Sequence, residues 1–463
     1  HASLFNEPLW LASTASVARI NILGSRERTF TFNGFDVNTD PLTFTLLAQE
    51  RPAYGAILGG TGASRTYLPF ERSGSDYLRF NADDGMDVSD EAQMEVRIID
   101  QPVSTLASGM LFLRGVDGKA EVAHTPALNA YPLTLEAWVK TSQTTGQQGL
   151  LNKYSSGSFN GYQVFLLNGE LRAWYFRNSG SHIWGGGDGL NAGFIADGRW
   201  HHIAFVVDDT GGRVYVDGEL RVSRVWNGTP GATTTTMPFS IGYYNSPVGG
   251  YFNGLIDEVR LWNRARSRTE LIRDAQAVLE GNEPGLIAYY RLDEGRTSAT
   301  VTDSAGGDQN GTLSGGWARL ASGAPIHTVQ VQGGVPRSFL LGGYSSMDAP
   351  DVLRYSLLSS PAQGTLSGGN QQARTYTPAG GGVFPFLYKA SNNPNDLVEP
   401  ATVYLIVRIP GDADLNGCVD DGDLLLVLFS FGADNPDADL NDDGVVDDGD
   451  LLQVLFNFGS GCS

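Results

Sequence analysis

The hydrophobic and polar positions along the first 410 residues follow mostly the pattern of short β-strands. Apolar and polar residues alternate over Arg199–Asp209 and over Tyr404–Val407, which is the period of a half-buried strand. Asn168-Gly169 and Asp217-Gly218 each separate two such runs, and these residue pairs favour the type I′ turns of β-hairpins. The pattern therefore predicts a body made of strands and tight turns, with one amphipathic helix over Arg264–Glu280.

After residue 410 the pattern changes to acidic clusters that are each followed by an apolar run. Leu424–Phe431 follows the first cluster, and Leu451–Phe458 follows the second. A surface helix needs only an apolar stripe, whereas these two runs are apolar almost all round. We expect two helices that pack together and leave an exposed apolar surface, which usually marks an interface. The expected interface residues are Leu426, Phe429, Phe431 and Phe456.

Two ways of covering this surface are open. The helices could rest on the neighbouring segment 325–410, because only the short connection Arg408–Asp412 separates them from it. They could instead accept a second chain, either a receptor or another copy of the protein, and near-duplicate helices suit a partner that approaches in two orientations. We expect intramolecular packing for part of the surface and self-association for the rest.

Two segments far apart in the chain repeat one another. Pro52-Ala-x-Gly55 and Arg65-Thr-Tyr67 recur 309 residues later as Pro361-Ala-x-Gly364 and Arg374-Thr-Tyr376. Short alternating strands surround both copies, so we expect two small β-sandwiches over residues 1–101 and 325–410. Both segments resemble bacterial immunoglobulin-like or cadherin-like modules.

The region between them, 107–322, closely resembles the laminin-G-like, concanavalin-A-type jelly roll. The resemblance rests on "LTLEAWVKT", "DGRWHHIAFVVDDTGGRVYVDGEL", "GLIDEVRLWNRARSRTEL" and "GLIAYYRLDEG", which occur in the family's order. The two resemblances together imply a mainly β fold class, in which two immunoglobulin- or cadherin-like sandwiches flank a concanavalin-A-like jelly roll. A small α-helical module over 411–463 completes the expected architecture.

Charge and cysteine content change the picture of the C-terminal tail most. The net charge is −20, and residues 411–463 hold 13 of the 51 acidic residues, all Asp, with no Lys or Arg. This local excess argues against nucleic acid as a partner and favours a polyvalent cation. Cys418 and Cys462 are the two cysteines, so we expect one disulfide rather than two free thiols. A disulfide implies an oxidising compartment, either secreted or at the cell surface. The start at His1 suggests a mature or excised product, and no apolar run is long enough for a membrane span.

Each acidic cluster has the spacing of an EF-hand-type calcium loop, with oxygen ligands at positions 1, 3, 5, 7, 9 and 12 and glycine at position 6. Gly417 and Gly444 stand at position 6, and position 7 contributes a backbone carbonyl. The two ligand sets are Asp412, Asp414, Asn416, Cys418, Asp420 and Asp423, and then Asp439, Asn441, Asp443, Val445, Asp447 and Asp450. We therefore expect two Ca²⁺ ions, with Val419 and Val446 at position 8 joining the loops to a shared core.

Paired loops with Asp at position 12, each leading into Asp-Leu-Leu, resemble a dockerin over 411–459. The resemblance implies two calcium ions and docking onto a cohesin or a similar receptor. Asp421-Gly422 and Asp448-Gly449 stand where cellulosomal dockerins often carry Ser/Thr-type recognition pairs. This departure puts a cellulosomal partner in doubt.

The sequence shows no familiar catalytic motif. Glucanases of the jelly-roll class carry carboxylates spaced E-x-D-x-x-E on one face of a strand. The nearest acids here, Asp257 and Glu258, are adjacent, so they should point to opposite faces. We expect these acids and His201-His202 to be structural, and we expect the protein not to be an enzyme.

Aromatic, loop-like segments offer a candidate sugar-stacking surface. Its members are Trp184, Tyr243 and Tyr244, together with Trp174 and Tyr251; the alternative is that these rings fill the core. Asp36, Asn38 and Asp40 have the alternating oxygens with which cadherin-like modules bind calcium.

Two functions remain. The first is a non-catalytic extracellular structural or adhesive protein that assembles through calcium-stabilised modules, as a fibre or a cell-surface subunit. The alternative is a carbohydrate-binding or enzyme-accessory subunit that the dockerin-like module displays on a scaffold. The first is preferred because the assembly features are explicit in the sequence, whereas the glycan-binding features are vague.

Overall fold

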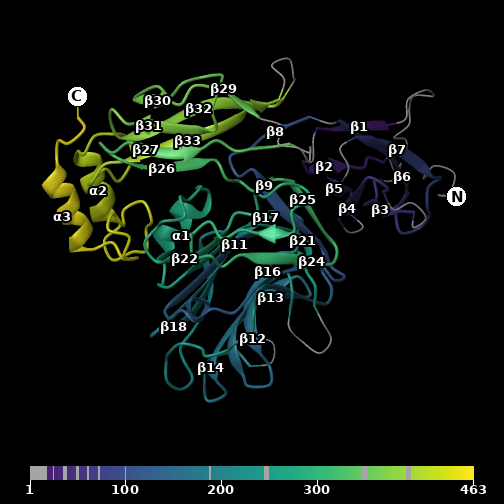
Figure 1. The fold of residues 1–463 in the computed structure, drawn as a ribbon, viewed down its shortest axis with the longest axis horizontal. Helices are drawn as coiled ribbons and strands as arrows, with labels where there is room; N and C mark the ends of the chain where they lie inside the picture. The colour runs from purple at the N-terminus through teal and green to yellow at the C-terminus, as the bar shows by residue number, and fades with distance from the viewer. Residues whose placement is uncertain are drawn as a thin grey trace.

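The computed structural model describes most of the chain and shows a mainly β protein. The described residues are 18–23, 26–34, 39–47, 52–59, 62–70, 73–99, 101–186, 189–244, 250–345, 353–392 and 398–462. Figure 1 shows a large central sandwich, one small sandwich at its upper right and another at its upper left, and two helices at the C-terminal end. Within the described residues, no helix has the length and apolarity needed to cross a membrane.

Two large sheets form the central sandwich. The nine-stranded sheet consists of β15 (Ser181–Ile183), β14 (Glu170–Asn178), β13 (Asn160–Leu167), β12 (Gln147–Ser155), β20 (Phe239–Ile241), β10 (Lys119–Val122), β24 (Gly311–Ser314) and β23 (Thr300–Val301), with β16 (Leu190–Phe194) paired to β14. The eight-stranded sheet consists of β19 (Glu219–Arg224), β18 (Gly211–Val216), β17 (Trp200–Asp208), β11 (Leu133–Lys140), β21 (Asn253–Trp262), β9 (Gly109–Arg114) and β25 (Trp317–Ala321), with β22 (Leu286–Tyr290) paired to β21.

The two predicted hairpin turns of this sandwich have the required backbone. Asn168 and Gly169 have φ values of 52° and 81°, and Asp217 and Gly218 have values of 53° and 77°. A type I′ turn needs positive φ at both central residues, which Asn, Asp and Gly tolerate best. The apolar side chains of the hairpin strands, such as Val164 and Phe205, fill the core between the two sheets.

The two small sandwiches share one strand arrangement. The first pairs a sheet of β1 (Ala18–Leu23), β7 (Ala92–Ile99), β6 (Gly74–Asp83) and β3 (Thr43–Leu46) with a sheet of β2 (Arg28–Thr31), β5 (Ser64–Pro69) and β4 (Gly55–Leu58). The second pairs β26 (Thr328–Gln332), β33 (Ala401–Arg408), β32 (Gly382–Ser391) and β29 (Arg354–Leu357) with β27 (Arg337–Leu340), β31 (Ala373–Thr377) and β30 (Thr365–Ser367). A short sheet of β8 (Val103–Ser104) and β28 (Gly343–Tyr344) links the segment after the first sandwich to the second.

The sequence repeat marks equivalent contacts in these two sandwiches. Arg65 donates to the carbonyl of Phe44 at 2.6 Å, and Arg374 donates to the carbonyl of Tyr355 at 2.9 Å. A Cβ atom on Gly55 would lie 2.5 Å from the Tyr67 ring. One on Gly364 would lie 2.7 Å from the Tyr376 ring. The repeated arginines therefore join the two sheets of each sandwich, and the repeated glycines leave room for the tyrosine rings. The immunoglobulin-like or cadherin-like assignment stays a prediction.

Both small sandwiches rest on the outer face of the eight-stranded sheet. Leu58 and Leu68 of the first sandwich pack with Met110 and Phe112 of β9. Trp138 of β11 belongs to the apolar cluster of the second sandwich. The other face of this sheet lines the core of the central sandwich, so the sheet is buried on both sides, as its nearly continuous apolar strands suggest.

The helix of the body, α1 (Arg268–Ala275), is shorter than the predicted Arg264–Glu280. It begins at a capping box, in which Ser267 and Glu270 satisfy each other's backbone N–H groups. It ends where the chain turns to the second sandwich. The N–H groups of His327 and Thr328 each donate to the carbonyl of Gln276 at 3.0 Å. These bonds to another domain replace the last helical turns. One short 3₁₀ helix, η1, spans Pro126–Asn129.

The tail contains the two predicted helices, α2 (Asp421–Phe429) and α3 (Asp448–Asn457). Asp420 and Asp447 are their N-caps, and each forms a capping box with the Asp three residues on. Carboxylates at these ends accept otherwise unpaired N–H groups and face the positive end of the helix dipole. The acidic clusters therefore begin the helices that the apolar runs complete.

Candidate functional site

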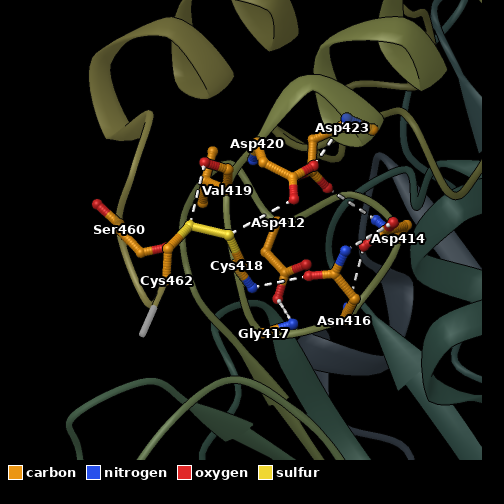
Figure 2. The surroundings of a disulfide bond; sticks show 11 residues. Asp412, Asp414, Asn416, Gly417, Cys418, Val419, Asp420, Asp423, Ser460 and Cys462 are labelled. Atoms are coloured by element: carbon orange, nitrogen blue, oxygen red, sulfur yellow. Dashed lines mark hydrogen bonds between the residues drawn. A yellow bond between two sulfur atoms is a disulfide. The ribbon is translucent and has the colours of Figure 1, made fainter.

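The first acidic loop draws three carboxylates together. Asp412, Asp414 and Asp423 each place one oxygen within 4.8 Å of the others. Asp423 Oδ1 accepts the N–H groups of Ala413 and Asp414 at 2.7 and 3.1 Å, while its Oδ2 accepts that of Asp420 at 2.8 Å. Position 12 thus joins the start of the loop to the helix that follows it. Figure 2 shows these side chains around the loop.

The second loop repeats the hydrogen bonds of position 12, whereas among the described residues the grouping of three carboxylates within 4.8 Å occurs in the first loop alone. Asp450 Oδ1 accepts the N–H groups of Leu440 and Asn441 at 2.7 and 3.0 Å, and its Oδ2 accepts that of Asp447 at 2.9 Å. The glycines at position 6, Gly417 and Gly444, have φ values of 92° and 94°, which is why glycine is needed there. Val419 and Val446 are fully buried in one core with Val427 and Val454, as the shared-core hypothesis expects.

The residues of both loops fit a hard cation. All their ligand atoms are oxygens, the class that calcium prefers. Asp412 is 1% exposed, and its Oδ1 atom has no hydrogen-bond partner within the described part of the chain. Burial, together with the nearby carboxylates of Asp423 and Asp414, raises the pKa of Asp412 to about 6. Each loop could hold one Ca²⁺, with the carbonyls of Cys418 and Val445 as the expected seventh-position ligands.

A disulfide joins the first loop to the end of the chain. The structure contains the predicted bond between Cys418 and Cys462, whose Cα atoms are 4.4 Å apart. The N–H of Val419 donates to the carbonyl of Ser460, and the N–H of Gly459 donates to that of Val419. The chain end is thereby fixed against the first loop by covalent and backbone bonds.

The two tail helices expose an apolar surface, which we call the α2–α3 surface. Phe429 is 84% exposed and Phe456, at the equivalent position of the second helix, is 82% exposed. The other members come in equivalent pairs and are Leu425 and Leu452, Leu428 and Leu455, and Phe431 and Phe458. Leu426, expected at the interface, instead packs against the core of the tail.

The expectation that the neighbouring sandwich covers part of the α2–α3 surface is wrong. The tail meets the body through its acidic loops: a Cβ atom on Gly417 would lie 2.5 Å from the carbonyl of Gly381. The loops, rather than the helices, lie against the body: the first packs on the backbone of Gly381, and the second pairs with polar side chains of α1. In Figure 1, α2 and α3 lie at the outer edge of the molecule.

The two adjacent acids of β21 do not point to opposite faces, contrary to the expectation from alternation. The pairing of β11 with β21 shifts register here, and Glu258 has a φ of 51°. Glu258 accepts from Arg260 at 2.8 Å and from Tyr289, while Asp257 accepts from Ser322 at 2.5 Å. A bulge therefore turns both acids towards the outer side of the sheet, where both are buried in polar contacts.

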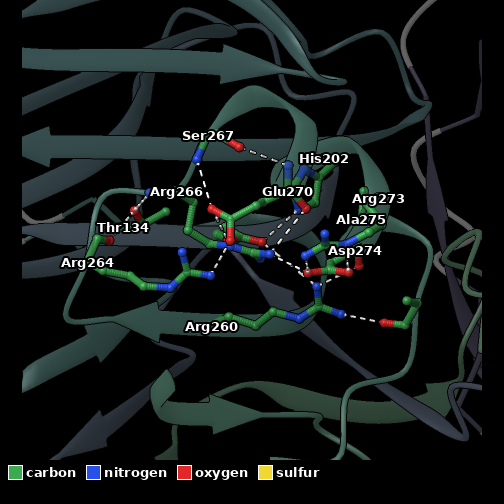
Figure 3. Close-up of polar contacts among 12 residues, drawn as sticks. Thr134, His202, Arg260, Arg264, Arg266, Ser267, Glu270, Arg273, Asp274 and Ala275 are labelled. Atoms are coloured by element: carbon green, nitrogen blue, oxygen red, sulfur yellow. Dashed lines mark hydrogen bonds and ion pairs between the residues drawn. The ribbon is translucent and has the colours of Figure 1, made fainter. Parts of the chain in front are cut away.

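A buried polar cluster connects α1 to the same face, as Figure 3 shows. Glu136 pairs with Arg266 at 3.1 Å and lies 3.5 Å from His202. Burial alone would raise the pKa of Glu136, but Arg266, His202 and Arg260 outweigh it and hold the value at about 2. His201 lies on the other side of the strand, 2.7 Å from Asp217. The two histidines therefore have carboxylate partners in the fold.

The aromatic candidates divide into two groups. Tyr244 is 8% exposed and packs against Phe165, with ring centroids 5.1 Å apart. Tyr243 contacts Tyr251 at 4.9 Å and the Lys119 ammonium at 4.8 Å. Trp174 belongs to the same buried cluster as Tyr244, so the core-filling alternative holds for these two rings. Asp36 and Asn38 lie outside the described residues.

Trp184 differs, because it lines a cleft of 760 Å³ at the open edge of the central sandwich. The cleft lies between β15 and β18–β19, and its other polar side chains include His182, Arg213 and Arg224. Sequence reasoning missed these residues, because Arg213 and Arg224 meet His182 only after β19 and β15 have taken neighbouring edges of two different sheets.

Comparison with known proteins places the central domain. Residues 114–272 match the family described as the concanavalin A-like lectin/glucanases superfamily. The class of this domain is therefore the concanavalin-A-like jelly roll, and the matched family within it is a laminin-G type. No curated protein matches the chain.

Several solved structures are similar to parts of the chain. The match with a candidate carbohydrate-binding protein from Bacteroides ovatus covers 67% of this chain and 97% of that one, at 15% identity and a TM-score of 0.37. The match with a pentraxin from Limulus polyphemus covers 49% of this chain and 94% of that one, at 14% identity and a TM-score of 0.29. The match with domains LG4-5 of the mouse laminin alpha1 chain covers 45% of this chain and 56% of that one, at 16% identity and a TM-score of 0.26.

The carboxyl of Asp293 gives the jelly roll a testable pH dependence. Burial raises its pKa to about 7, although Arg291 is 3.1 Å away. Because this folded pKa exceeds the unfolded value of about 3.9, the stability contributed by the protonated form is complete below pH 4 and is lost as pH rises through 7. Between pH 5 and 8 the unfolding temperature of the wild type should fall by about 2–4 °C more than that of Asp293→Asn, which lacks the titrating carboxyl.

The measurement is thermal unfolding of the full chain at constant calcium across that pH range. Asp293 keeps 23% of its side chain exposed, so the effect should be smaller than for a sealed carboxyl. Asp308→Asn is the control, because Asp308 is exposed and already has a φ of 55° that Asn tolerates. Equal pH slopes for the wild type and Asp293→Asn would contradict the assignment.

Proposed function

We propose that this protein is a non-catalytic extracellular assembly protein, whose C-terminal module binds two Ca²⁺ ions and docks onto a receptor through the α2–α3 surface. The carrying observation is the equal exposure of Phe429 and Phe456, 27 residues apart on equivalent helices. A contiguous exposed patch of apolar side chains usually marks an interface, and aromatic residues contribute most of the binding energy at many interfaces.

A separate receptor fits this surface better than a second copy of the chain. The module carries 13 Asp and no Lys or Arg, and Asp421 and Asp448 begin the two helices. Two such modules brought face to face would repel one another, whereas a receptor with an apolar groove and a basic rim would be attracted. A cohesin-type receptor is the partner that the dockerin resemblance implies.

Calcium binding can be tested on the full chain by titration calorimetry. We expect two ions, one of which is lost in Asp412→Ala and the other in Asp439→Ala, because each variant removes the first ligand of one loop. Calcium at about 100 times its dissociation constant should stabilise the module by about 2.7 kcal/mol per site. Asp421→Asn is the control, since Asp421 is exposed and stands outside both ligand sets. Two ions in Asp412→Ala, or none in the wild type, would refute the assignment.

Docking can be tested with a purified cohesin domain and the calcium-loaded chain. The double variant F429S/F456S should lose more than about 100-fold in affinity, because each phenylalanine should contribute about 2 kcal/mol or more. Phe194→Ser is the matched control, because Phe194 is 54% exposed on the jelly roll. If the chain alone sediments as an oligomer, and F429S/F456S sediments as a monomer, the partner of this surface is a second copy of the chain and not a receptor. An affinity that the double variant leaves unchanged would exclude this surface.

Saccharide binding is the second candidate function, and the cleft at β15 favours it. Among the described residues, no Asp or Glu lines the cleft, although the chain carries a net charge of −20. Arg213 is paired with Asp208, whereas the structure gives the Arg224 side chain no ion pair or hydrogen bond among the described residues. Trp184 offers a ring to a sugar face, and Arg224 offers a cation to a carboxylate. The matching ligand class is an acidic saccharide.

The test is calorimetric titration of the full chain with polygalacturonate oligomers and with neutral β-glucan oligomers. The wild type should bind the acidic oligomer more tightly, Arg224→Gln should remove that preference, and Trp184→Ala should weaken binding about tenfold. Arg221→Gln is the control, because Arg221 is an exposed residue of β19 outside the cleft. Equal affinity of the wild type for both oligomers, or a preference that survives Arg224→Gln, would exclude this cleft.

A further inference from the structure

The second acidic loop lies directly against α1 of the jelly roll. Thr269 Oγ1 donates a hydrogen bond of 2.6 Å to Asp439 Oδ2. Both side chains are buried, although 170 residues separate them in sequence. Asp439 is the first expected ligand of this loop, so a residue of another domain orients a carboxylate of the cation site.

Two arginines of the same helix hold other parts of this loop region. Arg273 forms an ion pair with Asp442, and Arg268 donates to the carbonyl of Asp434 at 3.2 Å. A Cβ atom on Gly444 would lie 3.5 Å from Cβ of Ser267, which places the loop backbone in van der Waals range of the helix start. The contacts therefore extend along α1 from its N-cap to its last turn.

The first expected ligands of both loops face the junction of the three domains. A cavity of 540 Å³ lies there, and both Asp412 and Asp439 line it. Arg273 of α1 and Arg408 of β33 line the same cavity. The loops thus form the side of the tail that meets the body, while the α2–α3 surface faces away.

We propose that the second calcium site is an interdomain site, which Thr269 and Arg273 of the jelly roll complete as positioning residues. Thr269 fixes the orientation of Asp439, and Arg273 neutralises Asp442 within the loop. Groups that orient metal ligands commonly change metal affinity by 10- to 100-fold. The first loop meets the body through backbone packing at Gly381 and receives no such hydroxyl from the residues that the structure describes. The two sites should therefore differ in their dependence on the jelly roll.

This inference rests on the proposed calcium binding and adds a coupling to it. Because coupling between two equilibria is reciprocal, a jelly roll that strengthens calcium binding must itself be held more firmly by the calcium-loaded loop. Calcium would then fix the direction in which the α2–α3 surface points. Removal of calcium should loosen α1 as well as the tail.

The first experiment measures calcium binding to Thr269→Val in the full chain by titration calorimetry. We expect about tenfold weaker binding at one site and no change at the other. Thr269→Ser, which retains the hydroxyl donor, should restore the affinity. Thr125→Val is the matched control, because Thr125 loses an equivalent hydrogen bond to Gln309 elsewhere in the jelly roll.

The second experiment measures hydrogen exchange of the wild type with calcium and with a chelator. Amides of Arg268–Ala275 should exchange faster without calcium, whereas those of the β12–β13 hairpin should not change. Two unaltered calcium affinities in Thr269→Val, together with unchanged exchange in α1, would overturn the interdomain site while leaving the proposed function intact. A wild-type chain that binds no calcium would refute both.

Discussion

The arrangement of the domains depends on one buried carboxylate, that of Glu136. A charge with no exposed surface is costly unless it is paired and hydrogen-bonded. Arg266, which belongs to the segment before α1, and Arg260 of the neighbouring strand supply that pairing. Arg266 in turn pairs with Asp274 in the last turn of α1. The charge of Glu136 therefore fixes the helix against the sheet at both of its ends.

The position of α1 then determines what the rest of the chain can contact. Its outer side holds the second acidic loop through Thr269 and Arg273, and the residues that follow it pair with β26 of the second sandwich. Trp138 connects α1 to the second sandwich. Its Nε1 donates to the carbonyl of Ala275 at 2.6 Å, and its ring belongs to the apolar cluster of the second sandwich. One eight-residue helix thereby contacts three domains.

Much of the local structure could be predicted from the sequence. Asn168-Gly169 and Asp217-Gly218 form the expected turns because positive φ values restrict which residues can stand there, and the loop glycines Gly417 and Gly444 follow the same rule. The bulge at Glu258 could not be predicted, because a period-2 pattern assumes an uninterrupted register.

Long-range contacts were likewise beyond prediction from local pattern. The bond between Thr269 and Asp439 joins residues 170 positions apart, and nothing in a serine/threonine-rich helix start distinguishes a donor to another domain. Tyr244 shows the converse: an aromatic residue in a glycine-rich segment suggests a free ring, whereas the fold packs it against Phe165. The apolar tail helices were predicted, but which side of the tail meets the body depends on the partners that α1 offers.

The division of the tail into a loop side and a helix side has a consequence for assembly. The loop side carries the carboxylates and faces the body, and the helix side carries Phe429 and Phe456 and faces away. A partner on the helix side therefore competes neither with a cation for its ligands nor with the jelly roll for Thr269. The proposed cation and the proposed partner would therefore occupy different sides of a module of about fifty residues, which docks on the body through its loops. A flexible tether would allow both of them to bind, but only a docked module gives the partner a fixed direction relative to the cleft at β15.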